Sequence, residues 1–304
     1  MDVMQNSIHS KFILTPIIGI LKDTVNACAG IGNGIETQSL GEYVLQTTFL
    51  KMTGASEQKQ KCICWEMATN DYDYRYKYLK KNYGECSSYA DKCSIYKDIK
   101  DRICKIDVTF DVNRLFGDID ITTPKKEYIN RRIEEERKIQ EAKKKAPLDE
   151  EDVKKIKEQI KNQYDTKGFS NKEIASLCRE VLFESISVVV DGIIGNTLLA
   201  QWEPRCFQDY LSLWNELSHY DYVKGDALLG KELQDLYNEI VYSHRNRCAH
   251  NLVSFQNNLP TLKTLEDEKF VYHSYYFRFS ILILLDEIFV RLYKAYQEAL
   301  EKVI

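Results

Sequence analysis

The sequence of 304 residues has 44% hydrophobic and 29% charged residues, a composition typical of a soluble globular protein. Its formal net charge of −4 excludes a chain that binds nucleic acid through an overall basic surface, so any RNA binding must be local. Five prolines and 13 glycines are few for this length, which favours long helices over a fold with many turns.

The cysteines indicate reduced thiols. There are nine of them, an odd number, and no C-x-x-C pair occurs. No histidine lies at zinc-ligand spacing from a cysteine, so the sequence predicts neither a metal nor a cofactor. Cys62 and Cys64 give a weak metal or redox signal, and two buried thiols are the favoured interpretation.

Without a signal peptide, we expect a cytoplasmic protein. Ile281–Leu285 is too short and too closely flanked by charges to cross a membrane.

Residues 1–123 are predicted to form a mainly helical N-terminal region. Apolar spacing predicts a first helix over 12–29, with Pro16 in its first turn. Two more helices are predicted over 40–53 and 56–67.

Two later segments of this region alternate with a period of two residues, which is the pattern of a strand. In 71–83, tyrosines alternate with charged residues, and a helix is the favoured interpretation. A solvated surface is favoured there over an RNA-contacting face of lysines and tyrosines. The span 106–112 carries the best strand signal in the chain, so a short extended segment is expected there.

Residues 124–163 differ in composition from the rest of the chain. The span 125–161 holds 13 Lys/Arg and 10 Asp/Glu, interleaved along the sequence. Two charged helices are predicted, over 125–145 and 149–163, supported weakly by ion pairs four residues apart. Because apolar residues are sparse, we expect a protruding hairpin or a linker.

Residues 164–304 are predicted to form a helical bundle, which makes the whole fold all-α. Ser170 and Glu173 form a capping box that begins a helix reaching about Ala200. A second helix is predicted to begin at Pro204, and a third to end near His250. The fourth predicted helix of the bundle covers residues 265–302. An alternative topology treats the charged hairpin as an insertion in one larger unit.

The third of these helices carries a polar motif at its end. Apolar residues at spacings of three and four lie upstream of the motif, between Leu229 and Val241. At about 100° per residue, Arg245, Asn246 and His250 fall outside the arc of those apolar residues. Asn246 and His250 are four residues apart and share one face. The motif is therefore predicted to face solvent, a ligand or a second subunit.

These residue types suit cleavage of RNA by its own 2′-hydroxyl. Histidine side chains in general titrate near neutrality, so His250 is the candidate for proton transfer. Arg245 stays charged and binds phosphate with a planar fork of donors. Asn246 can orient a neighbouring group, and we expect Arg247 and Tyr242 to contribute RNA binding. No metal is assigned to the site.

Arg245-Asn246-x-x-x-His250 at the end of a helix, in an all-helical context, resembles the motif of the HEPN superfamily. Covering roughly 165–304, the resemblance implies a metal-independent endoribonuclease, such as a toxin or an anti-phage effector. It also implies a homodimer whose two motifs form one RNA-cleaving site, with RNA and a regulatory protein or antitoxin as partners. By position, Arg245 is the motif arginine, Asn246 the polar residue after it, and His250 the motif histidine.

Two other functions remain open on the sequence. The same polar face would serve a non-catalytic module that binds nucleotides or RNA; the resemblance allows this, because the HEPN superfamily also has inactive members that bind nucleotides or partners. The chain could also be a protein-interaction scaffold whose charged hairpin recruits a partner. A polar helix end that is merely solvated, or that caps the last carbonyls of its helix, is the corresponding non-functional interpretation.

Overall fold

The computed structural model describes residues 7–32, 34–80, 86–195, 197–202, 227–250 and 274–302, and every regular element in these ranges is helical. The predicted all-α fold is therefore confirmed. In the described ranges, the elements in chain order are α1 (Ile8–Leu14), α2 (Ile18–Cys28), η1 (Ile35–Thr37), α3 (Gln38–Asn70), α4 (Tyr72–Lys80), α5 (Tyr89–Ile106), η2 (Val112–Phe116), α6 (Thr122–Lys144), α7 (Glu150–Lys167), α8 (Asn171–Ile194), α9 (Leu198–Trp202), α11 (Lys231–Leu236), η3 (Tyr237–Tyr242), α12 (Ser243–His250) and α14 (Tyr275–Glu301).

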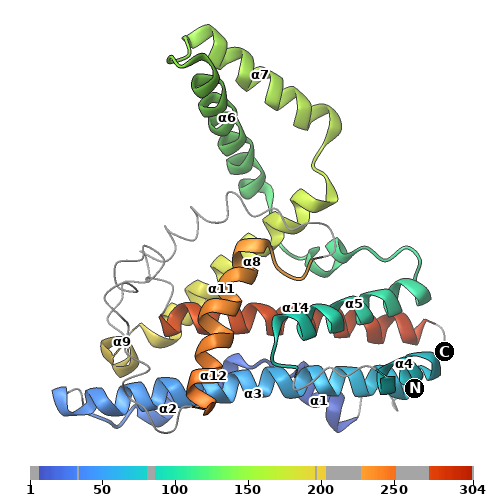
Figure 1. The fold of residues 1–304 in the computed structure, drawn as a ribbon, viewed down its shortest axis with the longest axis vertical. Helices are drawn as coiled ribbons and strands as arrows, with labels where there is room; N and C mark the ends of the chain where they lie inside the picture. Colours follow the sequence, from blue (N-terminus) through green and yellow to red (C-terminus); the bar gives the residue numbers. More distant parts are fainter. Residues whose placement is uncertain are drawn as a thin grey trace.

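Helix α14 is the centre of the packing. It contacts α3, α5 and α8, and Figure 1 shows α3, α5 and α14 extending in the same direction across the molecule. Most residues between Tyr275 and Tyr296 are buried. A helix that is apolar almost all round is stable only when other elements cover each of its faces, which is the arrangement found here. Ser274 caps it by accepting a hydrogen bond from the Phe277 N–H.

One hydrophobic core joins the N-terminal region to the C-terminal helices. It contains Phe49 of α3, Ile99 of α5, Phe183 of α8 and Leu285 of α14. Side chains from before and after the charged hairpin therefore bury one another. This packing is the one expected if the hairpin is an insertion in a larger helical unit. Within the described ranges, no helix combines the length and the apolar character needed to cross a bilayer.

The charged segment forms the predicted pair of helices. Helices α6 and α7 make a hairpin that projects from the helical body (Figure 1). A small separate cluster packs at its root, where Tyr128 of α6 and Tyr164 of α7 meet Phe169 and Leu177. Few other side chains of the hairpin are buried, so its attachment to the body depends on this cluster and on polar contacts beside it.

Helix α3 is one helix of 33 residues where two were predicted. The expected break near Gly54 is wrong. Gly54 is exposed, and a Cβ atom added there would meet nothing within 4 Å. Met52 and Thr53 before it and Ser56 after it are buried. Packing on both sides of the glycine holds the helix together, and tertiary contacts supply most of a helix's stability.

The first predicted helix is two helices, because the chain turns at Thr15 and Pro16. Helix α1 ends at Leu14 and α2 begins at Ile18. Thr15 has an extended backbone, with φ −79° and ψ 115°. Since a proline disfavours the helical conformation of the residue before it, Thr15 cannot continue α1. Pro16 lies between α1 and α2 and is not in the first turn of either helix, whereas the sequence predicts it in the first turn of one long helix.

The strand signal at 106–112 corresponds to no strand in the described residues; Asp107 and Asp111 have the expected extended backbone, and the residues between them form a turn. Ile106 is the last residue of α5, and Asp111 caps η2 by accepting from the Asn113 N–H. Phe110 and Val112 pack against the core, whereas Val108 is exposed. The alternating pattern thus anchors a turn between two helices, and the described residues offer no neighbouring strand to pair with it.

Other predictions have mixed outcomes. Helix α4 confirms the helix favoured over 71–83 as far as Lys80, and 81–83 lie outside the described residues. The capping box of Ser170 and Glu173 is present at the start of α8. Helix α8 ends at Ile194, before the predicted Ala200, and α9 follows it. The predicted helix after Pro204 and the first part of the predicted last helix, before Ser274, lie outside the described residues.

Candidate functional site

The motif lies on a continuous helical run that changes its hydrogen bonding twice. Helix α11 passes directly into the π-helical segment η3, and η3 passes into α12. Leu233, Leu236, Ile240 and Val241 are buried on this run, as their spacing predicts. Short π-helical segments inside α-helices occur frequently at functional sites.

The π-helical segment is held by the central helix. The Arg278 side chain of α14 donates from Nε to the carbonyl oxygen of Ile240 at 3.0 Å, and both residues are buried. This bond satisfies a main-chain acceptor inside η3. Since a π-helix has more residues in each turn than an α-helix, the face that α12 presents differs from the one that α-helical spacing predicts.

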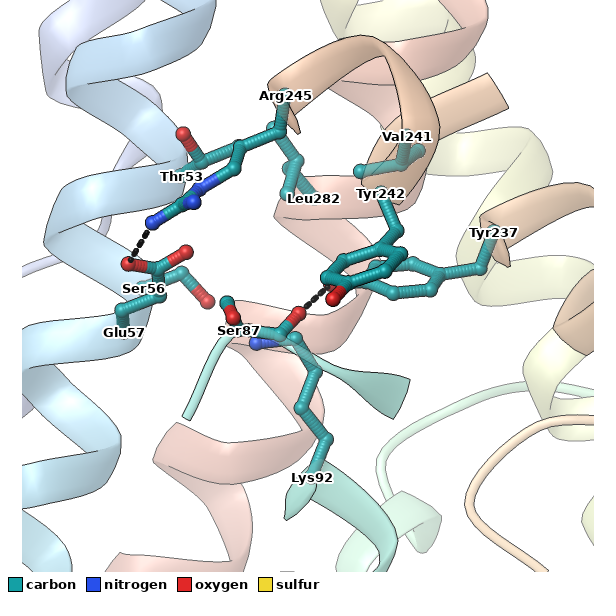
Figure 2. A pocket seen from close by; sticks show the side chains of 10 residues that line it. All are labelled: Thr53, Ser56, Glu57, Ser87, Lys92, Tyr237, Val241, Tyr242, Arg245 and Leu282. Atoms are coloured by element: carbon teal, nitrogen blue, oxygen red, sulfur yellow. Dashed lines mark hydrogen bonds and ion pairs between the residues drawn. The ribbon is translucent and has the colours of Figure 1, made fainter. Parts of the chain in front are cut away.

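Arg245 is consequently turned inward, toward α3. Its side chain is 21% exposed, so the expectation that this residue faces away from the core is wrong. Its Nη2 lies 3.2 Å from Glu57 Oε2 of α3, and the Glu57 side chain is 15% exposed (Figure 2). Its Nη1 donates to Asn246 Oδ1 at 3.3 Å. Two separate acceptors thus fix the plane of the guanidinium group.

Arg245 and Glu57 lie at one side of a small pocket between α3, α5, η3 and α12 (Figure 2). With these two side chains paired, the enclosed space is close to that of one water molecule. Hydroxyl groups and charged groups make up most of its polar lining. The residues that line it are Thr53, Ser56, Glu57, Ser87, Lys92, Tyr237, Val241, Tyr242, Arg245 and Leu282.

Lys92 brings a second cation to this pocket from α5. It is 1% exposed, and its Nζ donates to Gln60 Oε1 at 3.1 Å and to the carbonyl oxygen of Cys86 at 2.9 Å. Burial lowers the pKa of Lys92 to about 8, the nearby carboxylate of Glu57 opposes that shift, and the charge of Arg245 adds to it. The ammonium therefore lies close to its titration point at neutral pH.

The turn before α5 forms the floor of the pocket. Cys86 has φ 59°, a left-handed conformation that is uncommon outside glycine. Lys92 holds its carbonyl oxygen, and the Tyr237 hydroxyl donates to the carbonyl oxygen of Ser87 at 3.2 Å (Figure 2). Lys92 therefore has two roles at the pocket: it brings a positive charge, and it holds the turn before α5 by its hydrogen bond to the Cys86 carbonyl oxygen.

The two motif-region histidines have different surroundings. His244 Nε2 lies 3.1 Å from the Tyr275 hydroxyl and 3.4 Å from Cys248 Sγ, and its ring packs at 5.0 Å from that of Phe49. His244 therefore joins α12 to α3 and α14 as a packing residue. Burial raises the pKa of the Cys248 thiol, which disfavours a reactive thiolate beside it.

His250 is the last residue of α12, and its side chain lies outside the part that the structure describes. Because 243–250 is α-helical, Asn246 and His250 share a face by their spacing of four. Tyr242 lines the pocket with Arg245, whereas Arg247 does not line it. The structure therefore brings Tyr242, Arg245 and Asn246 together.

Glu57 and Lys92 were not predicted as site residues. Their distance from Arg245 along the chain leaves no local pattern that links the three. One signal was present in α3, where Thr53, Ser56, Glu57 and Gln60 form a polar stripe at spacings of three and four. A polar stripe on a face that is buried elsewhere along the helix marks a place where the fold needs polar contacts.

Within the described ranges, no group of three or more His, Cys, Asp or Glu side chains is arranged to hold a metal ion. No protein-family model, curated protein or solved structure matches this chain.

Proposed function

We propose that the protein is a metal-independent endoribonuclease of the HEPN type. The observation that carries the proposal is the fixed guanidinium of Arg245, held by Glu57 and Asn246 on the helix that ends at His250. Arginine, a polar residue and histidine thus follow one another within two turns of one helix, and the arginine lines a pocket. The resemblance of this motif to that superfamily supports the same assignment.

The proposed reaction is a transesterification within the RNA chain. The 2′-hydroxyl of a ribose attacks the adjacent phosphorus and loses its proton, while the 5′-oxygen leaves and gains one. The products are a 2′,3′-cyclic phosphate and a 5′-hydroxyl. Arg245 stabilises the charge on the phosphate, Asn246 orients its neighbours, and His250 transfers a proton. Arg247 and Tyr242 bind the flanking RNA.

A homodimer is part of this proposal. One copy of the motif supplies one histidine for proton transfer, whereas the reaction benefits from both a base and an acid. A twofold contact that brings two copies of α12 together would supply both, and such contacts are the commonest oligomer geometry. Light scattering tests the stoichiometry, and mixed dimers of wild type and His250→Ala test the sharing. A monomer whose activity is first order in enzyme would contradict the shared site.

The activity test is cleavage of end-labelled RNA in excess EDTA. We expect His250→Ala and Arg245→Ala each to slow cleavage at least about 100-fold, the range for loss of a proton-transfer or charge-stabilising group. Matched controls are His9→Ala on α1 and Arg114→Ala in η2, which lie away from the pocket and should cleave as wild type. Cleavage that persists in His250→Ala would reject the assigned mechanism.

A second function has one observation in its favour. In the structure, Glu57 occupies a donor of Arg245, so this donor is not free to stabilise charge that develops on a phosphate during cleavage. A non-catalytic module would bind RNA through the same face and release no product. Equal RNA affinity of wild type and His250→Ala, with no cleavage by either, would favour this binding module over the ribonuclease.

A further inference from the structure

The least expected charge in the site is the buried ammonium of Lys92. A buried lysine is unfavourable unless hydrogen bonds or a counter-charge compensate its lost hydration. An ammonium has three donors, and among the described residues Lys92 donates to two acceptors, Gln60 and Cys86. Its side chain lines the same pocket as Arg245, and in Figure 2 it reaches from α5 toward Ser87.

We propose that this pocket binds one phosphodiester group of RNA, with Lys92 and Arg245 as its two cations, and that the phosphate displaces the carboxylate of Glu57 from Arg245. The proposal rests on the proposed function, because it takes the phosphate from an RNA chain. It adds a binding residue, Lys92, and gives Glu57 the role of a competitor for Arg245.

The charges in the pocket fit this ligand. Lys92 and Arg245 contribute two positive charges and Glu57 one negative charge, which leaves a net charge of +1. A phosphodiester carries a single negative charge, so it neutralises the pocket. The Ser56 hydroxyl lies in the same lining and can donate to a phosphate oxygen, whereas the Thr53 hydroxyl donates to the carbonyl oxygen of Leu50.

The geometry explains why Glu57 must move. While Arg245 and Glu57 are paired, the enclosed space is too small for a phosphate group. Both side chains are only partly buried, and Nη2 donates to Glu57 over 3.2 Å, at the long end of the normal range. Opening this pair widens the pocket and frees a guanidinium edge. A phosphate can then take two parallel donors from Arg245, a stronger arrangement than the single bond to Glu57.

The test measures binding without cleavage. The probe is a 2′-deoxy tetranucleotide, which has phosphodiester groups but no attacking hydroxyl, titrated calorimetrically at pH 7. We expect Glu57→Gln to bind it about tenfold more tightly than wild type, because the competitor and its repulsion of the phosphate are removed. We expect Lys92→Met to bind it about tenfold more weakly. Unchanged or weaker binding by Glu57→Gln would overturn the competitor role.

The matched control for Glu57→Gln is Glu66→Gln, which removes a partly buried carboxylate from the same helix outside the pocket. It should bind the probe as wild type. Since Lys92 also holds the Cys86 turn, Lys92→Met is compared only where circular dichroism and melting show that it is folded. If the folded Lys92→Met variant binds as wild type, Lys92 is only structural and the proposal fails.

Two further measurements show whether the phosphate comes from RNA or from a free ligand, and whether the phosphate site and the ribonuclease activity stand or fall separately. A nucleoside 5′-monophosphate and inorganic phosphate are titrated in parallel. Binding of either one without binding of the tetranucleotide would assign the pocket to a free phosphate ligand and overturn the RNA assignment. Tetranucleotide binding with the expected variant pattern, but no cleavage of any RNA, would reject the ribonuclease and keep the phosphate site. If the Lys92→Met and Glu57→Gln variants cleave RNA as wild type does, the ribonuclease assignment stands and the phosphate site is rejected.

Discussion

The ammonium of Lys59 on α3 lies 2.6 Å from the carboxylate of Asp286 on α14, in the interior of the protein. The same carboxylate accepts the main-chain N–H of Ile17 at 2.9 Å, just before α2. Burial raises the pKa of Asp286, and the charge and hydrogen bond of Lys59 oppose that shift. One buried ion pair therefore joins three helices.

This pair predicts a large loss of stability when one partner is removed. Asp286→Ala leaves the Lys59 charge buried without a partner and should lower the free energy of unfolding by about 3–5 kcal/mol. The double variant Lys59→Met, Asp286→Leu removes both charges and should lose less than the single variant. Urea denaturation gives both values. A single variant within about 1 kcal/mol of wild type would show that the pair contributes little.

Lys92 predicts a dependence of stability on alkaline pH. Its pKa is lowered from 10.5 to about 8 in the folded protein, chiefly by burial. Between these pH values the unfolded chain holds a proton that the folded protein has lost, so this group makes folding more favourable as pH rises. Below pH 8 its burial opposes folding by up to about 3 kcal/mol, and the opposition fades toward pH 10.5.

The measurement compares wild type with Lys92→Met by denaturation from pH 7 to pH 10. Taking the difference cancels the titration of other groups, such as the cysteine thiols. The charges that act on Lys92 are those of Glu57, Asp91 and Arg245, with Cys86 beside them. Wild type should gain stability relative to the variant across this window. A difference that stays constant with pH would contradict the lowered pKa of Lys92.

Gly54 predicts a stabilising substitution. It lies in the middle of α3 on a solvent-exposed side of the helix, where an added Cβ atom would meet nothing within 4 Å. Gly54→Ala should raise the free energy of unfolding by about 0.5–1 kcal/mol, because alanine loses less backbone freedom on folding into a helix. Thermal melting should show a rise of about 1–4 °C. A lower melting temperature would mean that α3 needs a flexible position there.

Glu173 predicts how the hairpin is attached. Its carboxylate accepts from the hydroxyls of Tyr128 and Tyr164, at 3.1 and 2.8 Å, and from the N–H and hydroxyl of Ser170. Glu173→Ala should remove the capping box and leave both tyrosines without this acceptor, at a cost of about 1–3 kcal/mol. Hydrogen exchange should quicken at the bases of α6 and α7. The neighbouring exposed Lys172→Ala is the control and should change neither.

We expect the removal of Arg245 to change the stability of the protein much less than the removal of a core side chain on the same helical run. Its ion pair is partly exposed, so Arg245→Ala should cost only about 1 kcal/mol of stability. Ile240→Ala, a truncation of a fully buried residue on the same helical run, should cost about 2–5 kcal/mol. Melting curves of the two variants make the comparison. Equal losses would make Arg245 a structural residue and weaken its assignment to the phosphate.

Patterns that repeat within a helix were predictable from the sequence. The capping box of Ser170 and Glu173 predicted the start of α8, and the interleaved charges predicted the hairpin of α6 and α7. Caps and amphipathic spacing depend on residues within about two turns, so they are readable locally. The same locality explains the error at Gly54, and it explains why the strand signal at 106–112 belongs to a turn between two helices, since side chains from distant helices decided both conformations.

The sequence by itself determined the helical class, the buried face that leads to the motif, and the spacing that puts Asn246 and His250 on one face of α12. Only the tertiary structure decided that Arg245 turns toward Glu57 and that Lys92 reaches the same pocket. A helical pattern specifies which face of a helix is buried but not which helix covers it. Glu57 and Arg245 are 188 residues apart, and packing around α14 brings them together.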